Sequence, residues 1–477
     1  LSSCFPQVRW DHTNVSEPTQ QTGHTQEMSL TKVAFSFLVV MVLLPTAIGR
    51  PQAFQQPYGI ESQNDIENIA PIRQQILMEE EWLRWRKKHI VPEVMRRVGV
   101  DVWLIGEEDG ALYYSLVPAN YEGLVSQRYD ALIFIDKGAD DGVESLAIDA
   151  GEVADLINSH DPSHIGVSRG SREQFAEIVD SEMAARFVVS RDLRTGFLEK
   201  RNPEEVSAFN HVARVAYDII AEAFSNRVVV PDVTTTDDLN WWIRQRYRNL
   251  GLETSDHPTI TIQRSRLERP KYEEDDEHFT IEVPPRNGYN MIIRRGDMIS
   301  VDTGINYFGV GTDTQQVAYV LKEGETDAPE GLQVALNNTN RLQIHFANAF
   351  AAGKPSNDIV NDALEAAWDD GLRPSIYSHP LPYYLRRYSL NGGFIKMRYG
   401  AGPGLGGGEL AEPAPLLPPG GYPVYANTTY AMELHTWTSV PEWGGQDVRI
   451  TLEQNVAMTE DRLVFLGGRQ VEWYIIK

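Results

Sequence analysis

Residues 296–314 read GDMISVDTGINYFGVGTDT, and this stretch decides the fold of the second half of the chain. We predict a β-hairpin here, because residues 298–301 are apolar and rich in β-forming types and residues 316–321 resume a strand. Glycine and asparagine at residues 304–306 permit a turn between the two strands.

Two aspartates, Asp302 and Asp313, lie in the apolar part of this hairpin. An acid in such a place is costly unless something neutralises it. Two acids that flank one turn can face the same space, where like charges favour a bound cation or a shared proton. Because Asp is also a common turn residue, a purely turn-forming role for both acids stays open on this segment alone.

Three more candidate ligands follow, His379, Glu433 and Glu453, and both glutamates lie within strand-like runs. Each residue taken singly is weak evidence, because most histidines and strand glutamates bind no metal. Together, one imidazole and four carboxylates suit two divalent ions of borderline-to-hard character, such as Mn, Co, Zn or Fe. A water or hydroxide shared by two such ions would be a nucleophile at neutral pH.

The five candidate ligands follow one another in the order Asp, Asp, His, Glu, Glu, and Asp313 lies eleven residues after Asp302. In this order and spacing the sequence resembles the pita-bread metallopeptidase family. That family includes Xaa-Pro aminopeptidases, prolidases, methionine aminopeptidases and the non-peptidase creatinase. The likeness covers residues 65–477 and is most specific at residues 302–313 and 448–461. It implies an α/β (α+β) fold, with a creatinase-type N-terminal α/β domain followed by a C-terminal pita-bread catalytic domain.

The resemblance also implies a role for each ligand. Asp302 would chelate one ion, Asp313 and Glu453 would bridge the two, and His379 and Glu433 would complete the other. Glu433 would be the general base that receives the proton of the bridging water. The N-terminal amine of the substrate would bind near Asp302.

The sequence departs from the family after His379. The family has a Gly three residues after this ligand and a substrate-contacting His seven residues after it, where this chain has Pro382 and Arg386. Tyr399 stands where a continuation of the motif would place that His. Arg386 and Tyr399 are therefore the candidate hydrogen-bond donors, and residues 386–398 would be an insertion or a gene-model error such as a retained intron.

A second substrate-contacting His of the family has no clear counterpart. His257 and His278 precede the hairpin, but the spacing of each to Asp302 fits poorly, and we interpret both as polar loop histidines. The glycine run at residues 400–408 lacks the Lys-Ser/Thr of a phosphate loop and is interpreted as irregular loop backbone.

The C-terminal domain, residues 199–477, is expected to begin with two helices. Asn202 suits an N-cap and Pro203 the first turn of a helix that runs to about residue 224. A second helix begins at residues 234–237, and its apolar side chains are spaced for one buried face. These side chains are Leu239, Trp242, Ile243, Tyr247 and Leu250. We expect a strand at 259–263, helices at 332–352 and 356–371, and two strands near the end.

The N-terminal domain, residues 65–198, alternates helix-forming stretches with short apolar runs, a pattern typical of an α/β domain. The helices are expected at residues 71–97 and 172–186. The strands are expected at residues 101–106, 131–135, 145–148, 164–167 and 187–189.

One segment of this domain, Gly166 to Gly170, matches the G-x-S-x-G nucleophile elbow, with Ser168 as the nucleophile. The pattern is short, and Ser171 with Gln174 makes an equally good capping box for the helix that follows. A serine hydrolase is therefore the less favoured interpretation.

The first residue is Leu, and the first methionine is Met28. We therefore expect residues 1–27 to lie upstream of the true start. Residues 28–49, with Lys32 before an apolar run at 33–44, fit a secretory signal peptide. The run is shorter than the roughly 20 residues of a membrane span, although a buried helix would also explain it. Residues 50–64 are expected to be a linker.

The expected product is secreted, has no membrane anchor in its mature form, and contains no disulfide, because the only cysteine, Cys4, falls in the leader. The net charge of −24 over 477 residues argues against a nucleic-acid partner, because such partners require a basic face.

The favoured function is a secreted dinuclear aminopeptidase or dipeptidase that acts on short peptides, with proline in second position, through two divalent ions (Mn, Zn or Co). A homodimer is left open as its assembly. The alternatives are a catalytically impaired pita-bread binding protein and a creatinase-like hydrolase of non-peptide C–N bonds.

Overall fold

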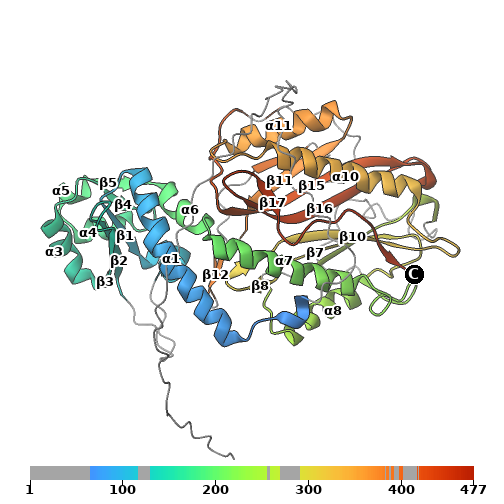
Figure 1. Cartoon of the computed structure of the whole chain (residues 1–477), viewed down its shortest axis with the longest axis horizontal. Helices are drawn as coiled ribbons and strands as arrows, with labels where there is room; N and C mark the ends of the chain where they lie inside the picture. The colour runs from blue at the N-terminus through green and yellow to red at the C-terminus, as the bar shows by residue number, and fades with distance from the viewer. Residues whose placement is uncertain are drawn as a thin grey trace, which may run out of the picture. The chain divides into compact units, whose positions relative to one another are not determined.

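A computed structural model describes residues 65–116, 129–254, 258–268, 290–381, 383–385, 388–390, 397–400, 416 and 418–477 (Figure 1). The sequence-based interpretations of the leader, the signal peptide, the linker and Cys4 fall outside these residues and stay predictions. The same holds for His257, His278, Pro382 and Arg386. Within the described ranges, no helix is long and apolar enough to cross a membrane.

The N-terminal part contains a five-stranded sheet in the order β3-β2-β1-β4-β5. Strands β1, β4 and β5 are parallel to one another, and β2 and β3 extend the sheet by antiparallel pairing. Every predicted strand is confirmed. The three central strands of the sheet are almost fully buried, whereas the two edge strands, β3 and β5, are partly exposed. The strands are β1 Val102–Gly106, β2 Ala131–Asp136, β3 Val143–Ile148, β4 Ile165–Val167 and β5 Phe187–Val189.

Helices accompany this sheet, and the predicted helix at 71–97 is confirmed as α1. The single helix predicted at 172–186 is wrong, because Val179 is extended and Asp180 starts a new helix by accepting the N–H groups of Glu182 and Met183. The helices are α1 Ile72–Val98, α2 Ala111–Leu116, α3 Ala150–His160, α4 Arg172–Ile178, α5 Ser181–Ala184 and α6 Arg191–Glu199.

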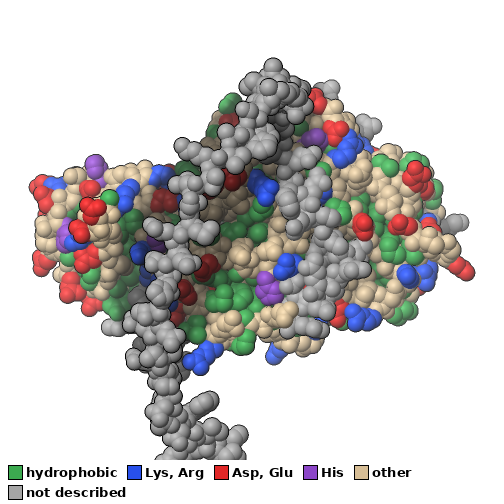
Figure 2. Space-filling view, in the orientation of Figure 1, with side chains coloured by type: hydrophobic (Ala, Val, Ile, Leu, Met, Phe, Trp, Pro, Cys, Tyr) green, Lys and Arg blue, Asp and Glu red, His purple; other side chains and the backbone are tan. Residues whose placement is uncertain are grey.

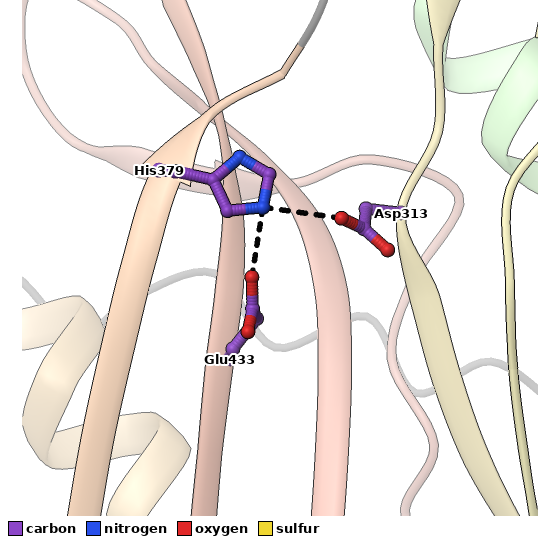
Figure 3. Close-up of side chains that lie close together, drawn as sticks. All are labelled: Asp313, His379 and Glu433. Atoms are coloured by element: carbon purple, nitrogen blue, oxygen red, sulfur yellow. Dashed lines mark hydrogen bonds and ion pairs between the residues drawn. The ribbon is translucent and has the colours of Figure 1, made fainter. Parts of the chain in front are cut away.

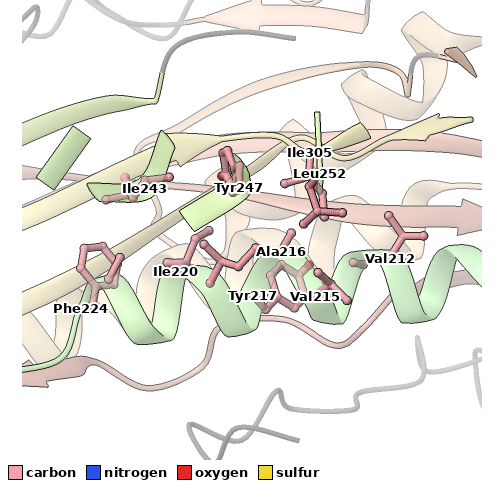
Figure 4. Close-up of a cluster of buried hydrophobic side chains, with 14 of the residues drawn as sticks. Val212, Val215, Ala216, Tyr217, Ile220, Phe224, Ile243, Tyr247, Leu252 and Ile305 are labelled. Atoms are coloured by element: carbon pink, nitrogen blue, oxygen red, sulfur yellow. The ribbon is translucent and has the colours of Figure 1, made fainter. Parts of the chain in front are cut away.

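The C-terminal part begins with α7 (Pro203–Ala223), whose start forms as the sequence predicts. Asn202 Oδ1 accepts the Glu205 N–H at 2.7 Å, and Glu205 Oε2 accepts the Asn202 N–H at 2.8 Å. Helix α8 (Thr236–Asn249) follows, and its predicted apolar face is confirmed as core. Its Ile243 and Tyr247 pack against α7 (Figure 4).

A nine-stranded sheet forms the centre of this part, with a main path in the order β14-β11-β15-β16-β10-β7-β6. Strand β17 pairs with β16, and β18 pairs with β10. The strands are β6 Thr259–Gln263, β7 Met298–Thr303, β10 Thr314–Val320, β11 Pro374–Pro380, β14 Met397–Gly400, β15 Thr428–Val440, β16 Gln446–Met458, β17 Leu463–Phe465 and β18 Tyr474–Ile476.

The predicted hairpin is confirmed, because β7 and β10 pair with Asp302 opposite Gln315. The turn expected at residues 304–306 is wrong. The chain instead makes a smaller hairpin, β8 (Asn306–Tyr307) and β9 (Val310–Gly311), and reverses at Phe308 and Gly309. Strand β9 pairs with β12 (Tyr383–Leu385), which pairs with β13 (Tyr388–Leu390).

Two helix pairs cover one face of the large sheet. Ile299 and Val301 of β7 share an apolar cluster with α7 and α8. Met432 and Leu434 of β15 share another with α10 (Glu330–Ala349) and α11 (Ser356–Asp369). Because side chains alternate along a strand, the residues between these apolar ones face the other side of the sheet. We call that side the inner face.

Acidic and basic side chains are interspersed on the molecular face shown in Figure 2. The charged side chains visible on this face in Figure 2 are therefore of both signs.

Candidate metal centre

The five residues singled out in the sequence meet on the inner face in two groups that share Asp313. One group is Asp313, His379 and Glu433, and the other is Asp302, Asp313 and Glu453. In each group, one ligand atom per residue lies within 4.8 Å of the others. Figure 3 shows the imidazole of His379 pointing at both carboxylates of the first group.

The register of four neighbouring strands brings the acids together. Asp302 on β7 is opposite Gln315 on β10, and Gln315 is opposite Glu453 on β16. Glu453 is in turn opposite Glu433 on β15. Directly paired residues point to the same side of a sheet, so these acids line up across the inner face.

His379 and Asp313 join this row from strand ends. His379 lies two residues after Tyr377, which is opposite Glu433, and so its side chain shares the inner face. Asp313 immediately precedes β10, and its backbone N–H donates to Asn455 Oδ1 at 3.1 Å. Asn455 Nδ2 also donates to Thr314 Oγ1, which ties the start of β10 to β16.

His379 contacts both acids of the first group through its imidazole ring. Its Nε2 lies 2.8 Å from Glu433 Oε1 and 3.1 Å from Asp313 Oδ2. Its Nδ1 is 2.9 Å from the Pro380 carbonyl oxygen, to which it donates. Burial alone lowers the pKa of His379, but hydrogen bonds and charges from the two carboxylates raise it to about 11.

Glu453 is the most enclosed acid of the second group and is 7% exposed. Burial raises its pKa well above the ordinary value, and the negative charges of Asp302, Asp313 and Glu433 raise it further. Four carboxylates around one imidazole therefore leave an excess of negative charge in a confined space.

This donor set fits divalent ions. One imidazole nitrogen and four carboxylates suit Mn, Zn or Co. The hydrogen bond from Nδ1 to the Pro380 carbonyl directs Nε2 of His379 at the acids, the orientation that metal-binding histidines typically have. The excess negative charge supplies the electrostatic reason to hold cations there.

The proposed substrate donors are only partly within the described residues. The backbone of Tyr399 lies in β14, opposite Ile376 on β11, the strand that carries His379. Arg386, His257 and His278 lie outside the described residues. The roles assigned to Tyr399 and Arg386 stay predictions.

Ser168 serves a turn in the N-terminal part. Its Oγ accepts the N–H groups of Gly170 at 3.0 Å and Ser171 at 3.1 Å, and lies 3.1 Å from Ser171 Oγ. The capping box predicted for Ser171 and Gln174 is wrong, because the Ser171 side chain makes no cap hydrogen bond to α4. The turn is closed from Ser168 instead.

Sequence reasoning missed three residues on the inner face beside the acids. His435 and Trp437 follow Glu433 at alternate positions of β15, and Arg449 is opposite Trp437 on β16. The Arg449 guanidinium lies 5.9 Å from the centre of the Trp437 ring. Burial, and then the charge of Arg449, lower the pKa of His435 to about 3. Counting in steps of two from Glu433 would have identified both β15 residues.

Comparisons with known proteins bear on the family of the chain and on its fold. Residues 207–460 match metallopeptidase family M24. No curated protein matches the chain in sequence.

Several solved structures share its fold. The X-Pro aminopeptidase of Thermotoga maritima MSB8 has 13% identity and a TM-score of 0.51, covering 80% of this chain and 99% of that one. A dipeptidase of Pyrococcus horikoshii OT3 has 15% identity and a TM-score of 0.51, with 82% and 100% covered. A variant of Escherichia coli aminopeptidase P has 12% identity and a TM-score of 0.51, with 83% and 96% covered.

Proposed function

This chain belongs to metallopeptidase family M24, and from that premise we propose that it is a metal-dependent aminopeptidase or dipeptidase acting on short peptides with proline in second position. Its fold is the one expected, an N-terminal α/β domain followed by a pita-bread domain. The observation that carries the proposal is the pair of overlapping donor groups that share Asp313.

The residues that would hold two divalent ions follow from these groups. Asp302, Asp313 and Glu453 would hold one ion, and Asp313, His379 and Glu433 the other. When bound, such ions activate a water molecule and polarise the scissile carbonyl. The finer role of Glu453 as a second bridging ligand is part of the proposal.

Glu433 is the residue we assign as general base. Its side chain is 18% exposed, so it can reach a bound peptide while remaining partly shielded from solvent. Its carboxylate would take the proton of the attacking water and pass it to the leaving nitrogen. Asp302, at the other end of the cluster, would bind the N-terminal amine of the substrate by charge.

The inner face beyond Glu433 offers a place for the remainder of the peptide. Alternate side chains on a strand are about 7 Å apart, which matches about two residues of an extended peptide. His435 and then Trp437 with Arg449 would therefore line the path of a short chain. Arg449 brings a positive charge and Trp437 a buried indole N–H, which together suit the terminal carboxylate.

A second candidate is a pita-bread scaffold that binds metal weakly or not at all, has an impaired substrate site and serves as a binding protein. It is favoured by one observation, that Tyr399, rather than a histidine, pairs with the strand of His379. Loss of one donor to the developing oxyanion typically slows turnover by about 10²–10³. A creatinase-like hydrolase of non-peptide C–N bonds would use the same ligands.

Metal analysis combined with peptide hydrolysis tests these candidates. We expect about two ions per chain, removed by a chelator together with hydrolysis of Xaa-Pro peptides. Asp313→Ala should lose both, whereas the matched Asp369→Ala, which changes an exposed acid on α11, should lose neither. Metal-loaded protein inert to peptides would favour the creatinase-like candidate, and folded protein without affinity for divalent ions would favour the binding scaffold.

We also propose that the mature protein is secreted. The support is the apolar run at residues 33–44 after Lys32, which lies outside the described residues. N-terminal sequencing of protein recovered from the medium of expressing cells tests this. A mature N-terminus near residue 50 is expected, and retention of the run in intracellular protein would contradict the proposal.

A further inference from the structure

The turn between the two aspartates has an unusual residue in it. Strands β8 and β9 are joined by Phe308 and Gly309, and both have positive φ, 54° and 68°. Two positive φ values define the tight hairpin turn that prefers Asn-Gly. A phenylalanine in this conformation is strained, and such strain persists only where the surroundings hold it.

The surroundings of Phe308 are aromatic and include a ring from a distant part of the chain. The residue is 5% exposed, and its ring stacks on Tyr307 with ring centres 4.3 Å apart. Trp82 of α1 lies 5.8 Å away on the same cluster. The ring contacts therefore offset the backbone strain of the turn.

Residues 65–70, which we call the arm, contact the same cluster from the N-terminal side. The Ala70 N–H donates to the Tyr307 hydroxyl at 2.6 Å, across 237 positions of sequence. Gln75 Nε2 donates to the Ala70 carbonyl at 2.6 Å, so both backbone groups of Ala70 are engaged. Ile66 and Ile69 of the arm pack on the cluster.

The small hairpin is joined by short, closely paired segments to the candidate metal ligands Asp302 and Asp313. Just inside them, the Ile305 N–H donates to Thr312 Oγ1 at 3.0 Å, and the Thr312 N–H donates to the Ile305 carbonyl at 3.0 Å. A Cβ on Gly304 would lie 2.2 Å from the Thr312 carbonyl oxygen. The two segments are therefore in close contact, so the turn cannot shift far without also shifting Asp302 and Asp313.

We propose that the arm is a positioning element for the metal centre, acting through Tyr307 and Phe308. Docked, it holds the strained turn and thereby the spacing of Asp302 and Asp313. Released, by cleavage or by a competing partner, it lets the turn relax and weakens binding of divalent ions. This inference rests on the proposed function, because it requires that the two aspartates bind metal.

Calorimetric titration of the full chain with Mn²⁺ tests the proposal. Tyr307→Phe removes only the acceptor of the Ala70 N–H, and we expect about fivefold weaker Mn²⁺ binding and faster amide exchange in the arm. Phe308→Ala removes the ring contacts that offset the strain of the turn but keeps a Cβ at the positive φ, and should weaken binding by at least as much. The matched control Tyr113→Phe removes a hydroxyl that donates to the Tyr129 carbonyl in the N-terminal part, and should leave Mn²⁺ affinity unchanged.

The outcomes separate this inference from the proposed function. Wild-type protein that binds no divalent ion overturns both. Wild-type protein that binds Mn²⁺ while Tyr307→Phe and Phe308→Ala bind it equally well overturns the inference alone. Equal weakening by Tyr113→Phe also overturns it, because the effect would then be a general loss of stability.

Discussion

Replacing Glu453 by Gln should stabilise the metal-free protein at pH 7 and remove its stabilisation by divalent ions. Glu453 is 7% exposed, and its pKa is raised by burial and by the charges of Asp302, Asp313 and Glu433. An acid with a raised pKa keeps its proton in the folded state and loses it in the unfolded state. Wild-type stability therefore falls as pH rises from 4.5 towards the folded pKa.

The size of the effect has an upper bound. Protonating a glutamate at pH 7 costs about 3.4 kcal/mol, because pH 7 lies about 2.5 pH units above its ordinary pKa of 4.5 and each unit corresponds to about 1.36 kcal/mol. Glu453→Gln avoids this cost, so its free energy of unfolding should exceed that of wild type by up to about 3.4 kcal/mol at pH 7. Below about pH 4 the difference should vanish.

Urea denaturation of metal-free protein at several pH values measures this difference. The matched control is Glu460→Gln, the same change at an exposed position just beyond β16, and it should shift stability by less than about 0.5 kcal/mol. With Mn²⁺ at about 100 times its dissociation constant, wild type should gain about 2.7 kcal/mol, whereas Glu453→Gln should gain little.

Two results would refute the reasoning. One is a Glu453→Gln protein less stable than wild type at pH 7 without metal, which would mean that the carboxylate is stabilised in the cluster. The other is equal stabilisation of both proteins by Mn²⁺, which would remove Glu453 from the ligand set.

Three further predictions follow from individual contacts. Binding of two divalent ions at pH 7 should release about two protons, because His379 and Glu453 both have raised pKa values and must lose their protons to act as ligands. Calorimetry in buffers of different ionisation enthalpy measures the number of protons released. Binding without proton release would count against these two ligands. Ser168→Ala should change kcat/KM for an Xaa-Pro peptide by less than about twofold, because the Ser168 hydroxyl closes a turn. A large loss of activity would instead support the serine-hydrolase interpretation. Arg264→Ala should lower the free energy of unfolding by about 3–5 kcal/mol, because Asp297 would remain buried without its bidentate partner. Urea denaturation measures this free energy. A decrease of less than about 1 kcal/mol would contradict the prediction.

Much of the local structure could be predicted because it depends on neighbours in sequence. The start of α7 follows from Asn202, Pro203 and Glu205, whose side chains and backbone satisfy one another within one turn. The break at Val179 between α4 and α5 was missed, because capping by Asp180 competes with helix continuation and the outcome depends on packing.

The site could be predicted in part. The family resemblance pointed to Asp302, Asp313, His379, Glu433 and Glu453, and the structure brings them together, while their role as ligands stays a proposal. His435 and Trp437 were missed, because no motif includes them and only the alternation along β15 places them beside Glu433.

The sequence alone determined where many of the helices and strands lie and which side chains are available as ligands, because these depend mainly on residue type and on neighbours within a few positions. Tertiary structure decided the register that aligns four strands, the turn at Phe308 and Gly309, and the contact of the arm with Tyr307. These features join residues far apart in the chain, and their geometry is set by packing against partners that local sequence does not identify.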